Sequence, residues 1–189
     1  VGYIGNLLME TLDRETMRTV IISHPELDFV FWGQYEKGGQ LTAFDKPEVF
    51  EFIEFLKAQP HVKLRGPVHP DQLSEETEKA DLFWVCWKLG ASKMWDGSNP
   101  LKILEYPSTG KPLVTHYIDA YKGNDLIDML PDRNSEGYLS LFNKVIQRIS
   151  EGENPESGRK RIALALDNSY NKQIERISEY VNQYCFTDS

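Results

Sequence analysis

The sequence of 189 residues lacks the features that mark several large classes of protein. No apolar run approaches the length of about 18 residues that suggests a membrane-spanning helix. The formal net charge of −8 argues against nucleic acid as the main partner, because phosphate backbones are bound by basic surfaces. Only two cysteines occur, Cys86 and Cys185, and neither stands near other metal-ligating residues or in a disulfide framework. We therefore expect no metal site, no nucleic-acid partner and a reducing compartment.

The start of the chain has neither an initiator methionine nor a signal peptide. It opens with VGYIGN, almost inside an apolar run, and we take this as an expectation that the chain is a fragment of a longer protein. No internal repeat, low-complexity tract or linker divides it. The length suits one domain, spanning residues 1–189.

What the sequence does contain is a regular alternation of short apolar runs and longer amphipathic stretches. The apolar runs predict six strands, at residues 1–5, 28–33, 61–66, 81–87, 111–116 and 126–130. The amphipathic stretches predict helices at residues 10–24, 46–59, 70–80 and 135–151, and two more within 153–184 that join near Asn168. The run DLFWVCW at 81–87 is typical of a central strand that is buried on both faces. The sequence thus predicts an α/β fold, a doubly wound Rossmann-like parallel sheet of about six strands with helices on both faces.

In such a sheet the ligand binds beyond the carboxyl ends of the strands, where the strand order reverses. The candidate loops are therefore those that follow the strands, at residues 5–9, 33–45, 65–70, 87–100 and 115–125. The first loop reads GYIGN and does not match the G-x-G-x-x-G pattern of dinucleotide-binding enzymes. No acidic residue ends the second strand, where Gly33 and Gln34 stand. An NAD-dependent enzyme is disfavoured.

The segment NPLKILEYPSTGKPLV, residues 99–114, carries the most specific functional signal. Asn99 and Pro100 are typical of a helix start, where free backbone N–H groups and the helix dipole attract an anion. Lys102 adds a full positive charge in the first turn. Glu105 follows three residues later, and its carboxylate can accept two hydrogen bonds from the adjacent hydroxyls of a ribose. The simpler interpretation is a surface Lys–Glu pair that stabilises the helix by about 0.2–0.5 kcal/mol.

The surrounding sequence resembles the nucleotide-sugar site of glycosyltransferases with the GT-B fold, in particular the glycosyltransferase group 1 or family 4-like proteins. The match consists of ADLFWVCW, a Pro-x-Lys-apolar-x-Glu-Tyr motif at residues 100–106 and a Gly-Lys-Pro-apolar-Val motif at residues 110–114. The stretches VGYIGNL, HPELDFVFWG, HVKLRGPV and ALDNSYNKQIERI agree with the family pattern in order and spacing. The resemblance covers nearly the whole chain.

The resemblance implies a set of roles for residues of this chain. Glu105 would hold the ribose hydroxyls, and Lys102 would stabilise the diphosphate as an electrostatic catalyst. The other nucleotide-binding residues would be Gly5 and Asn6 beside the phosphates, Pro67 and Val68 at the nucleobase, and Ser98, Asn99 and Leu101 at the helix start. The donor sugar would lie against Trp95, Asp96 and Gly97. No metal or other cofactor is implied.

The resemblance also implies what the whole protein does. The chain would be the C-terminal, donor-binding half of a two-domain enzyme, with the N-terminal acceptor domain absent. Its partners would be a nucleoside diphosphate sugar, that N-terminal domain, and a glycan or lipid-linked acceptor. The full-length protein would be a hexosyltransferase-type glycosyltransferase of polysaccharide or glycoconjugate biosynthesis, and the fragment alone would bind nucleotide without turnover. The expected location is the cytoplasm, with the absent domain as the part that could reach the inner face of a membrane.

Two other functions stay open: a non-catalytic Rossmann-like binding or regulatory module, and a nucleotide-sugar epimerase of the same architecture. Three positions depart from the family pattern. Gly97 stands where many retaining members carry a second glutamate, so retaining and inverting chemistry both stay open. The basic residues that clamp phosphates after the first strand are missing, and Arg14 is the nearest candidate. Pro107 predicts that the helix after Asn99 is short or kinked.

Overall fold

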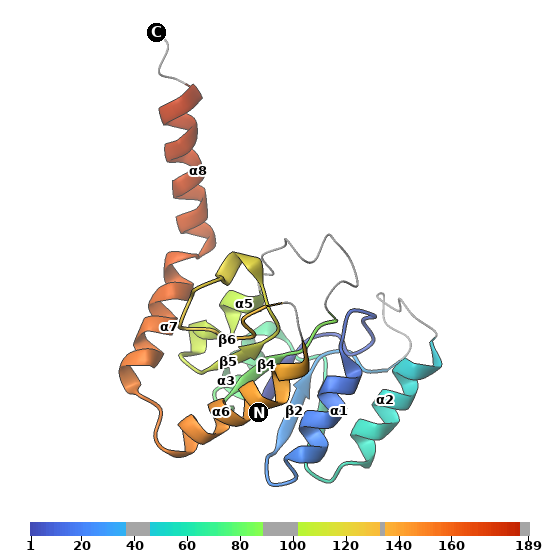
Figure 1. The fold of residues 1–189 in the computed structure, drawn as a ribbon. Helices are drawn as coiled ribbons and strands as arrows, with labels where there is room; N and C mark the ends of the chain where they lie inside the picture. The colour runs from blue at the N-terminus through green and yellow to red at the C-terminus, as the bar shows by residue number, and fades with distance from the viewer. Residues whose placement is uncertain (37–45, 89–101, 133–134, 186–189) are drawn as a thin grey trace.

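The computed structural model describes residues 1–36, 46–88, 102–132 and 135–185. Its centre is one sheet of six parallel strands (Figure 1). The strands are β1 (Gly2–Ile4), β2 (Phe29–Trp32), β3 (Val62–Gly66), β4 (Phe83–Val85), β5 (Leu113–Thr115) and β6 (Asp128–Met129). The predicted six-stranded, doubly wound α/β fold is confirmed.

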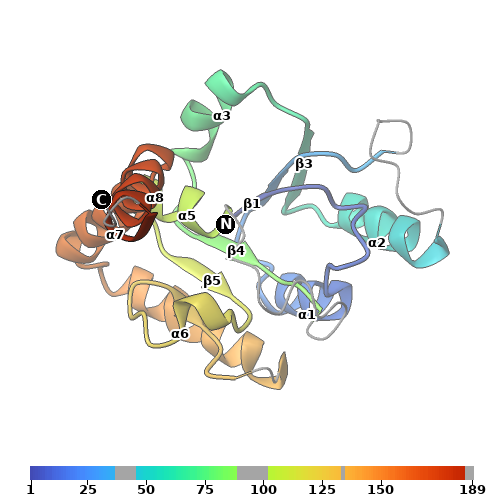
Figure 2. The same cartoon turned by 90° about the horizontal axis from the view of Figure 1, so that it is seen from above.

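Seven described helices cover the sheet or extend from it (Figures 1 and 2). They are α1 (Arg14–Ser23), α2 (Pro47–Ala58), α3 (Pro70–Thr77), α5 (Lys102–Glu105), α6 (Tyr138–Ser150), α7 (Pro155–Asp167) and α8 (Tyr170–Cys185). Three 3₁₀ turns accompany them, η1 (Pro107–Thr109), η2 (Asp119–Tyr121) and η3 (Ser135–Gly137). The first helix begins four residues later than predicted, because the side chain of Asp13 accepts a hydrogen bond from the backbone N–H of Thr16 and so caps the helix there.

Two hydrophobic cores lie on the two faces of the sheet. Along β4, Trp84 packs into the core under α1, α2 and α6, whereas Phe83 and Val85 pack into the core under α3 and α5. This arrangement follows from the strand geometry, since successive side chains point to opposite faces. It explains why the sequence at 81–87 is apolar without alternation. Cys86, at the end of this run, is buried as predicted.

The strand order β3-β2-β1-β4-β5-β6 places the reversal between β1 and β4. From β1, the next two strands are added in order toward one edge of the sheet, ending at β3. The chain then returns to the centre, where β4 pairs with β1, and β5 and β6 are added toward the opposite edge. In a sheet with such a reversal, the loops after the two central strands diverge, and ligands bind in the crevice between them. This is the edge of the sheet at which the sequence predicts ligand binding.

The C-terminal helices begin beside the segment that contains α5 and η1. Helix α7 packs beside η1, and Asn168 ends it before α8 begins, close to the predicted junction. Helix α8 projects away from the sheet, with Tyr170, Ile177 and Tyr184 each more than 60% exposed (Figure 1). Among the described residues, no helix combines the length and apolar character that crossing a bilayer requires.

Candidate functional site

The loops after the first three strands are joined by backbone hydrogen bonds at the carboxyl edge of the sheet. The N–H of Gly5 donates to the carbonyl of Trp32 at 2.8 Å, and the N–H of Gly33 donates to the carbonyl of Gly66 at 2.8 Å. Gly33 has φ = +134°, and a Cβ atom there would lie 2.1 Å from the carbonyl oxygen of Gly5. Only glycine fits, because a side chain would meet both strain and a backbone collision. These contacts hold the candidate loops in one layer.

The predicted phosphate loop is well ordered by its own side chains. The Oδ1 atom of Asn6 accepts a hydrogen bond from the N–H of Leu8 at 2.8 Å, which closes a turn typical of asparagine. Gly5 and Asn6 are both half-buried at the end of β1. The structure thus places them at the switch point, and their contact with a ligand stays a prediction.

Arg14 supports this loop from within. Its Nη2 donates to the carbonyl oxygens of Met9 at 2.6 Å and Leu7 at 3.3 Å, and its side chain is only 6% exposed. The guanidinium also lies 6.0 Å from the ring centroid of Phe52. The sequence identified Arg14 as the nearest substitute for a phosphate clamp, but its described contacts hold the loop backbone instead.

Helix α5 is fixed to the end of β1 by Tyr106, the residue directly after its last turn. The hydroxyl of Tyr106 donates to the carbonyl oxygen of Ile4 at 2.9 Å and accepts from the N–H of Ile4 at 3.1 Å. The ring stacks on Phe83 with centroids 4.9 Å apart. Burial raises the pKa of the Tyr106 hydroxyl well above its ordinary value, so the group is protonated and able to donate.

The buried side of this short segment determines where Glu105 lies. Ile103 and Tyr106 both pack into the core beneath α3 and α5, and Glu105, between them on the other side, is exposed. Lys102 is the first described residue of α5, three positions before Glu105. The backbone thus puts the two predicted ligand-binding residues one turn apart on α5, and the side chain of Lys102 is not among those that the structure describes.

Pro107 ends the helix as the sequence predicted. Helix α5 stops at Glu105, and the chain continues as η1, capped by Gly110 in the left-handed conformation at φ = +77°. The hydroxyl of Ser108 donates to the carbonyl oxygen of Glu105 at 2.6 Å, which satisfies a helix-end acceptor.

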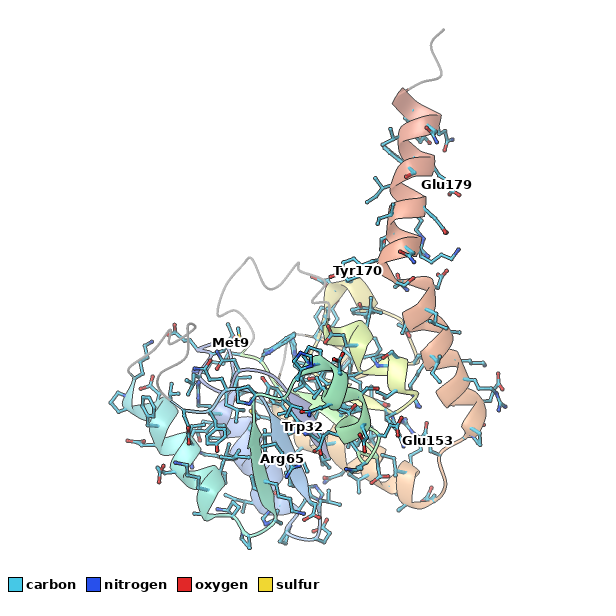
Figure 3. All side chains as sticks on the ribbon, turned by 180° about the vertical axis from the view of Figure 1, so that it is seen from behind. Met9, Trp32, Arg65, Glu153, Tyr170 and Glu179 are labelled. Carbon is cyan, nitrogen blue, oxygen red and sulfur yellow. The ribbon has the colours of Figure 1, made fainter. Side chains whose placement is uncertain are left out.

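A pocket of about 530 Å³ opens beside Glu105, between α5 and the junction of α7 and α8. Its lining is formed by Leu104, Glu105, Ser108, Ala165, Leu166, Asn168, Ser169, Tyr170 and Gln173. Tyr170 appears at this junction in Figure 3. Glu105 therefore borders a recessed surface.

A larger hollow of about 630 Å³ lies elsewhere, against β2, β3 and α3, where Trp32 and Arg65 are labelled in Figure 3. The charged groups around it neutralise one another: Arg65 donates to both carboxylate oxygens of Glu76 at 3.1 Å, and Lys63 pairs with Asp28 at 3.1 Å. This hollow offers no excess charge for an anion. The candidate site stays at Glu105, where the sequence predicts a ribose contact and where the second pocket opens.

The predicted nucleobase loop follows β3 at the same edge. Pro67 is exposed, and Val68 packs against the core that also contains Tyr106. His69 caps α3, since its Nδ1 accepts from the N–H of Asp71 at 3.4 Å. This cap gives His69 a structural role, and the nucleobase contact of Pro67 and Val68 stays a prediction.

Six predicted site residues lie outside the described residues: Trp95, Asp96, Gly97, Ser98, Asn99 and Leu101. The structure tests neither their contacts nor those of the Lys102 side chain. Within the described part of the chain, no three His, Cys, Asp or Glu side chains gather as metal ligands.

Comparison with known proteins gives a likeness in structure and none in sequence. No family model and no curated protein matches the sequence. A glycosyltransferase from Rickettsia africae superposes on 100% of the chain with a TM-score of 0.67 at 13% identity, over 48% of its own length. Anabaena Alr3699/HepE, solved in complex with UDP-glucose, superposes on 96% with a TM-score of 0.65 at 15% identity.

The chain has the fold of half a glycosyltransferase. It spans 48% of HepE as well, and 48% of the lipopolysaccharide outer core galactosyltransferase WaaB, which superposes with a TM-score of 0.53 at 15% identity. At such identities the likeness shows the fold alone. The predicted fold, one doubly wound half of the GT-B architecture, is therefore confirmed.

Proposed function

We propose that this chain is the donor-binding domain of a glycosyltransferase, and that it binds a nucleoside diphosphate sugar in the crevice between β1 and β4. One observation carries the proposal. Glu105 is exposed on a segment that Tyr106 fixes to the end of β1, at the switch point of a fold shared with a protein solved with UDP-glucose.

In the proposed reaction, an acceptor hydroxyl attacks the anomeric carbon of the sugar while the bond from that carbon to the diphosphate oxygen breaks. The hydroxyl proton passes to a base on the second domain in an inverting route, or to the leaving diphosphate in a retaining one. The electron pair leaves with the diphosphate, so negative charge grows on it in the transition state. A positive charge that is already in place stabilises this charge without reorganisation, which is the role we give Lys102. Glu105 would accept hydrogen bonds from both ribose hydroxyls. The residues proposed here include no metal ligand.

We place the remaining parts of the reaction in a second domain of a longer protein, because the structures that share this fold are about twice as long. That domain would bind the glycan or lipid-linked acceptor, and the full-length protein would transfer a hexose. This chain alone should bind nucleotide without turnover.

Calorimetric titration with UDP, GDP and ADP, and with the matching nucleosides, tests the diphosphate role. We expect Lys102→Ala to weaken diphosphate binding by about 10- to 100-fold, the equivalent of a lost charged hydrogen bond of about 1.5–3 kcal/mol, and to leave nucleoside binding unchanged. Lys144→Ala, an exposed lysine on α6, is the matched control. An equal loss for nucleotide and nucleoside would remove the role given to Lys102.

Glu105→Ala tests the ribose role in the same assay. Wild type should bind the ribonucleotide more tightly than its 2′-deoxy counterpart, and the variant should bind the two equally. Glu51→Ala, an exposed glutamate on α2, serves as the control and should keep the difference. If the folded wild-type chain binds none of the three nucleotides, the proposed function is wrong and a binding module of another kind is favoured.

A further inference from the structure

We propose that Arg161, on α7, is a positioning residue for the donor site: it holds the carbonyl oxygen of Gly110 and so fixes the segment that carries Glu105. This inference rests on the proposed function, because it concerns the accuracy with which Glu105 meets a ribose. Arg161 itself would not touch the ligand.

The residues from Glu105 to Lys111 form one internally bonded block. The hydroxyl of Thr109 donates to the carbonyl of Tyr106 at 2.7 Å and accepts from the N–H of Lys111 at 3.2 Å. The N–H of Gly110 donates to the carbonyl of Pro107 at 2.9 Å, and Ser108 bonds back to Glu105. Because these hydrogen bonds join its residues to one another, we treat the block as one rigid segment. Its position then depends on what holds its two ends.

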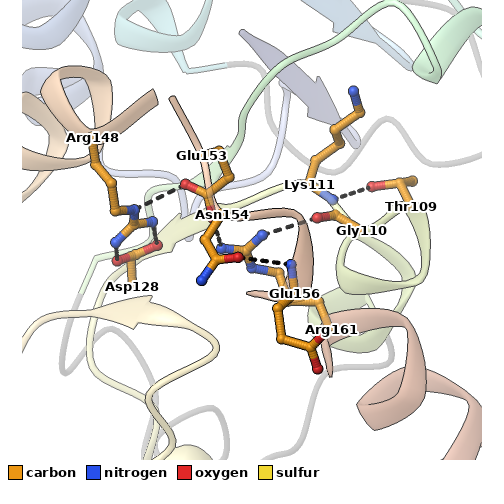
Figure 4. A network of polar contacts seen from close by, with 9 residues as sticks. All are labelled: Thr109, Gly110, Lys111, Asp128, Arg148, Glu153, Asn154, Glu156 and Arg161. Atoms are coloured by element: carbon orange, nitrogen blue, oxygen red, sulfur yellow. Dashed lines mark hydrogen bonds and ion pairs between the residues drawn. The ribbon is translucent and has the colours of Figure 1, made fainter. Parts of the chain in front are cut away.

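The two ends are held by different parts of the molecule. At the first end, Tyr106 binds both backbone groups of Ile4 on β1. At the second end, Nη1 of Arg161 donates to the carbonyl oxygen of Gly110 at 2.9 Å, across 51 positions of sequence (Figure 4). The block also continues into β5, where the N–H of Phe83 donates to the carbonyl oxygen of Pro112 at 2.9 Å, so the bond from Arg161 is a further restraint on Gly110 itself. This restraint helps to set the angle at which Glu105 leaves the surface.

The contact between α7 and this block is also close in its backbone. A Cβ atom on Gly158 would lie 3.3 Å from the carbonyl oxygen of Gly110, and a Cβ on Gly110 would lie 3.2 Å from Ile162. Two glycines therefore let α7 approach the block closely enough for Arg161 to reach Gly110. Because this contact is closely packed, losing the hydrogen bond from Arg161 should shift the position of the block.

The charge of Arg161 is stabilised by Glu153, and further ion pairs continue from that carboxylate to the sheet. Its Nη2 donates to Glu153, whose other carboxylate oxygen accepts from Nε of Arg148 at 3.1 Å. Arg148 then binds both carboxylate oxygens of Asp128, on β6, at 2.8 and 2.6 Å (Figure 4). Arg161 is 3% exposed, so it needs this partner to be buried as a cation.

Arginine is the side chain that this position requires. One terminal nitrogen binds Gly110 while the other binds Glu153, and the planar fork holds the two bonds at a fixed angle. Lysine has the same charge but a single nitrogen on a flexible stem, so it cannot reproduce that geometry. Arg161→Lys therefore removes the positioning and keeps the charge.

The test measures ribose discrimination: the ratio of affinities for the tightest-binding of UDP, GDP and ADP and for its 2′-deoxy counterpart, by calorimetry. We expect Arg161→Lys to lower this ratio by about threefold or more, because small misplacements weaken an oriented contact strongly. Hydrogen exchange at the N–H groups of Thr109 and Gly110 should accelerate in the same variant. Asp128→Asn is the matched control, since it weakens the far end of the ion-pair chain and leaves the Gly110 link in place.

The possible results distinguish failure of the positioning role from failure of the proposed function. A lowered ratio in Arg161→Lys, with the wild-type ratio in Asp128→Asn, supports the positioning role. A wild-type ratio in Arg161→Lys overturns it, as does an equal fall in both variants, which would reflect stability alone. If Glu105→Ala abolishes discrimination while Arg161→Lys keeps it, the proposed function survives and only this inference fails. If the folded wild-type chain binds no nucleotide, both fail.

Discussion

Replacing Tyr106 with phenylalanine should loosen α5 from the end of β1 without opening a cavity, because the change removes a single oxygen atom. The Tyr106 side chain is 1% exposed, so no water is at hand to replace the lost partner. The hydroxyl makes two hydrogen bonds, one donated and one accepted, both to the backbone of Ile4. The stacking of the ring on Phe83 is kept.

The magnitude follows from these two bonds. A buried hydrogen bond contributes about 1 kcal/mol net, so we expect the free energy of unfolding to fall by about 2 kcal/mol. For a chain of this size, that loss should lower the melting temperature by about 4–8 °C. Nucleotide affinity should fall as well, because Glu105 is next to the freed residue.

Chemical denaturation and calorimetry measure the first effect, and titration with the nucleotide measures the second. Tyr138→Phe is the control: its hydroxyl, also buried, shares its single proton between the carbonyl oxygens of Val85 at 3.0 Å and Val114 at 3.2 Å, and it lies on α6 at the opposite face of the sheet. It should lose a similar amount of stability and keep its nucleotide affinity. The reasoning is refuted if Tyr106→Phe is as stable as wild type, or if both variants lose affinity alike.

Two further perturbations test the framework of the site. Gly33→Ala should destabilise the fold by several times the loss in Gly123→Ala, measured by denaturation, since both have positive φ but only Gly33 faces a backbone atom at 2.1 Å; equal losses would contradict this. Burial alone would raise the pKa of Glu153, but the guanidiniums of Arg161 and Arg148 lower it below its ordinary value. The ionised Glu153 carboxylate therefore stabilises the fold fully above its unfolded-state pKa. This stabilisation is lost as the pH falls through the lower pKa of the folded state. Wild type should therefore lose more stability than Glu153→Gln in that acidic window, and parallel pH profiles would refute it.

The fold could be predicted because its signals are local. Apolar runs separated by amphipathic stretches predicted all six strands, and the buried run around Trp84 predicted the central one. The boundaries were less accurate where side-chain contacts decide them: Asp13 caps α1 four residues after the predicted start, and α3 ends at Thr77. The short helix before Pro107 was predicted correctly, because proline lacks the N–H that continues a helix.

The site could be predicted only in part, because the hydrogen bonds that hold it join residues far apart in the sequence. Parallel topology brings the loops after β1 and β3 to one edge, and that much follows from strand order. The bond from Tyr106 to Ile4 spans 102 positions, and nothing in the local sequence around either residue marks it. For Arg14, the sequence suggests a role that its described contacts do not show. Its position after the first strand makes it the nearest candidate for a phosphate clamp, whereas its buried guanidinium donates to the carbonyls of the loop.

Pro107 shows how a residue that breaks a helix can also fix it in place. In an unbroken helix, residues 106–110 would continue along one axis, and the carbonyl of Gly110 would lie about 7 Å further along that axis than Glu105. The proline ends α5 after one turn, and Gly110 reverses the chain in a left-handed cap. The reversal lets Tyr106 bind β1 at one end and Gly110 bind Arg161 at the other. A single turn such as Lys102–Glu105 is unstable alone, so tertiary contacts, including both anchors, hold Glu105 in place. The break in the helix thus allows two separate parts of the molecule to hold the segment that carries Glu105.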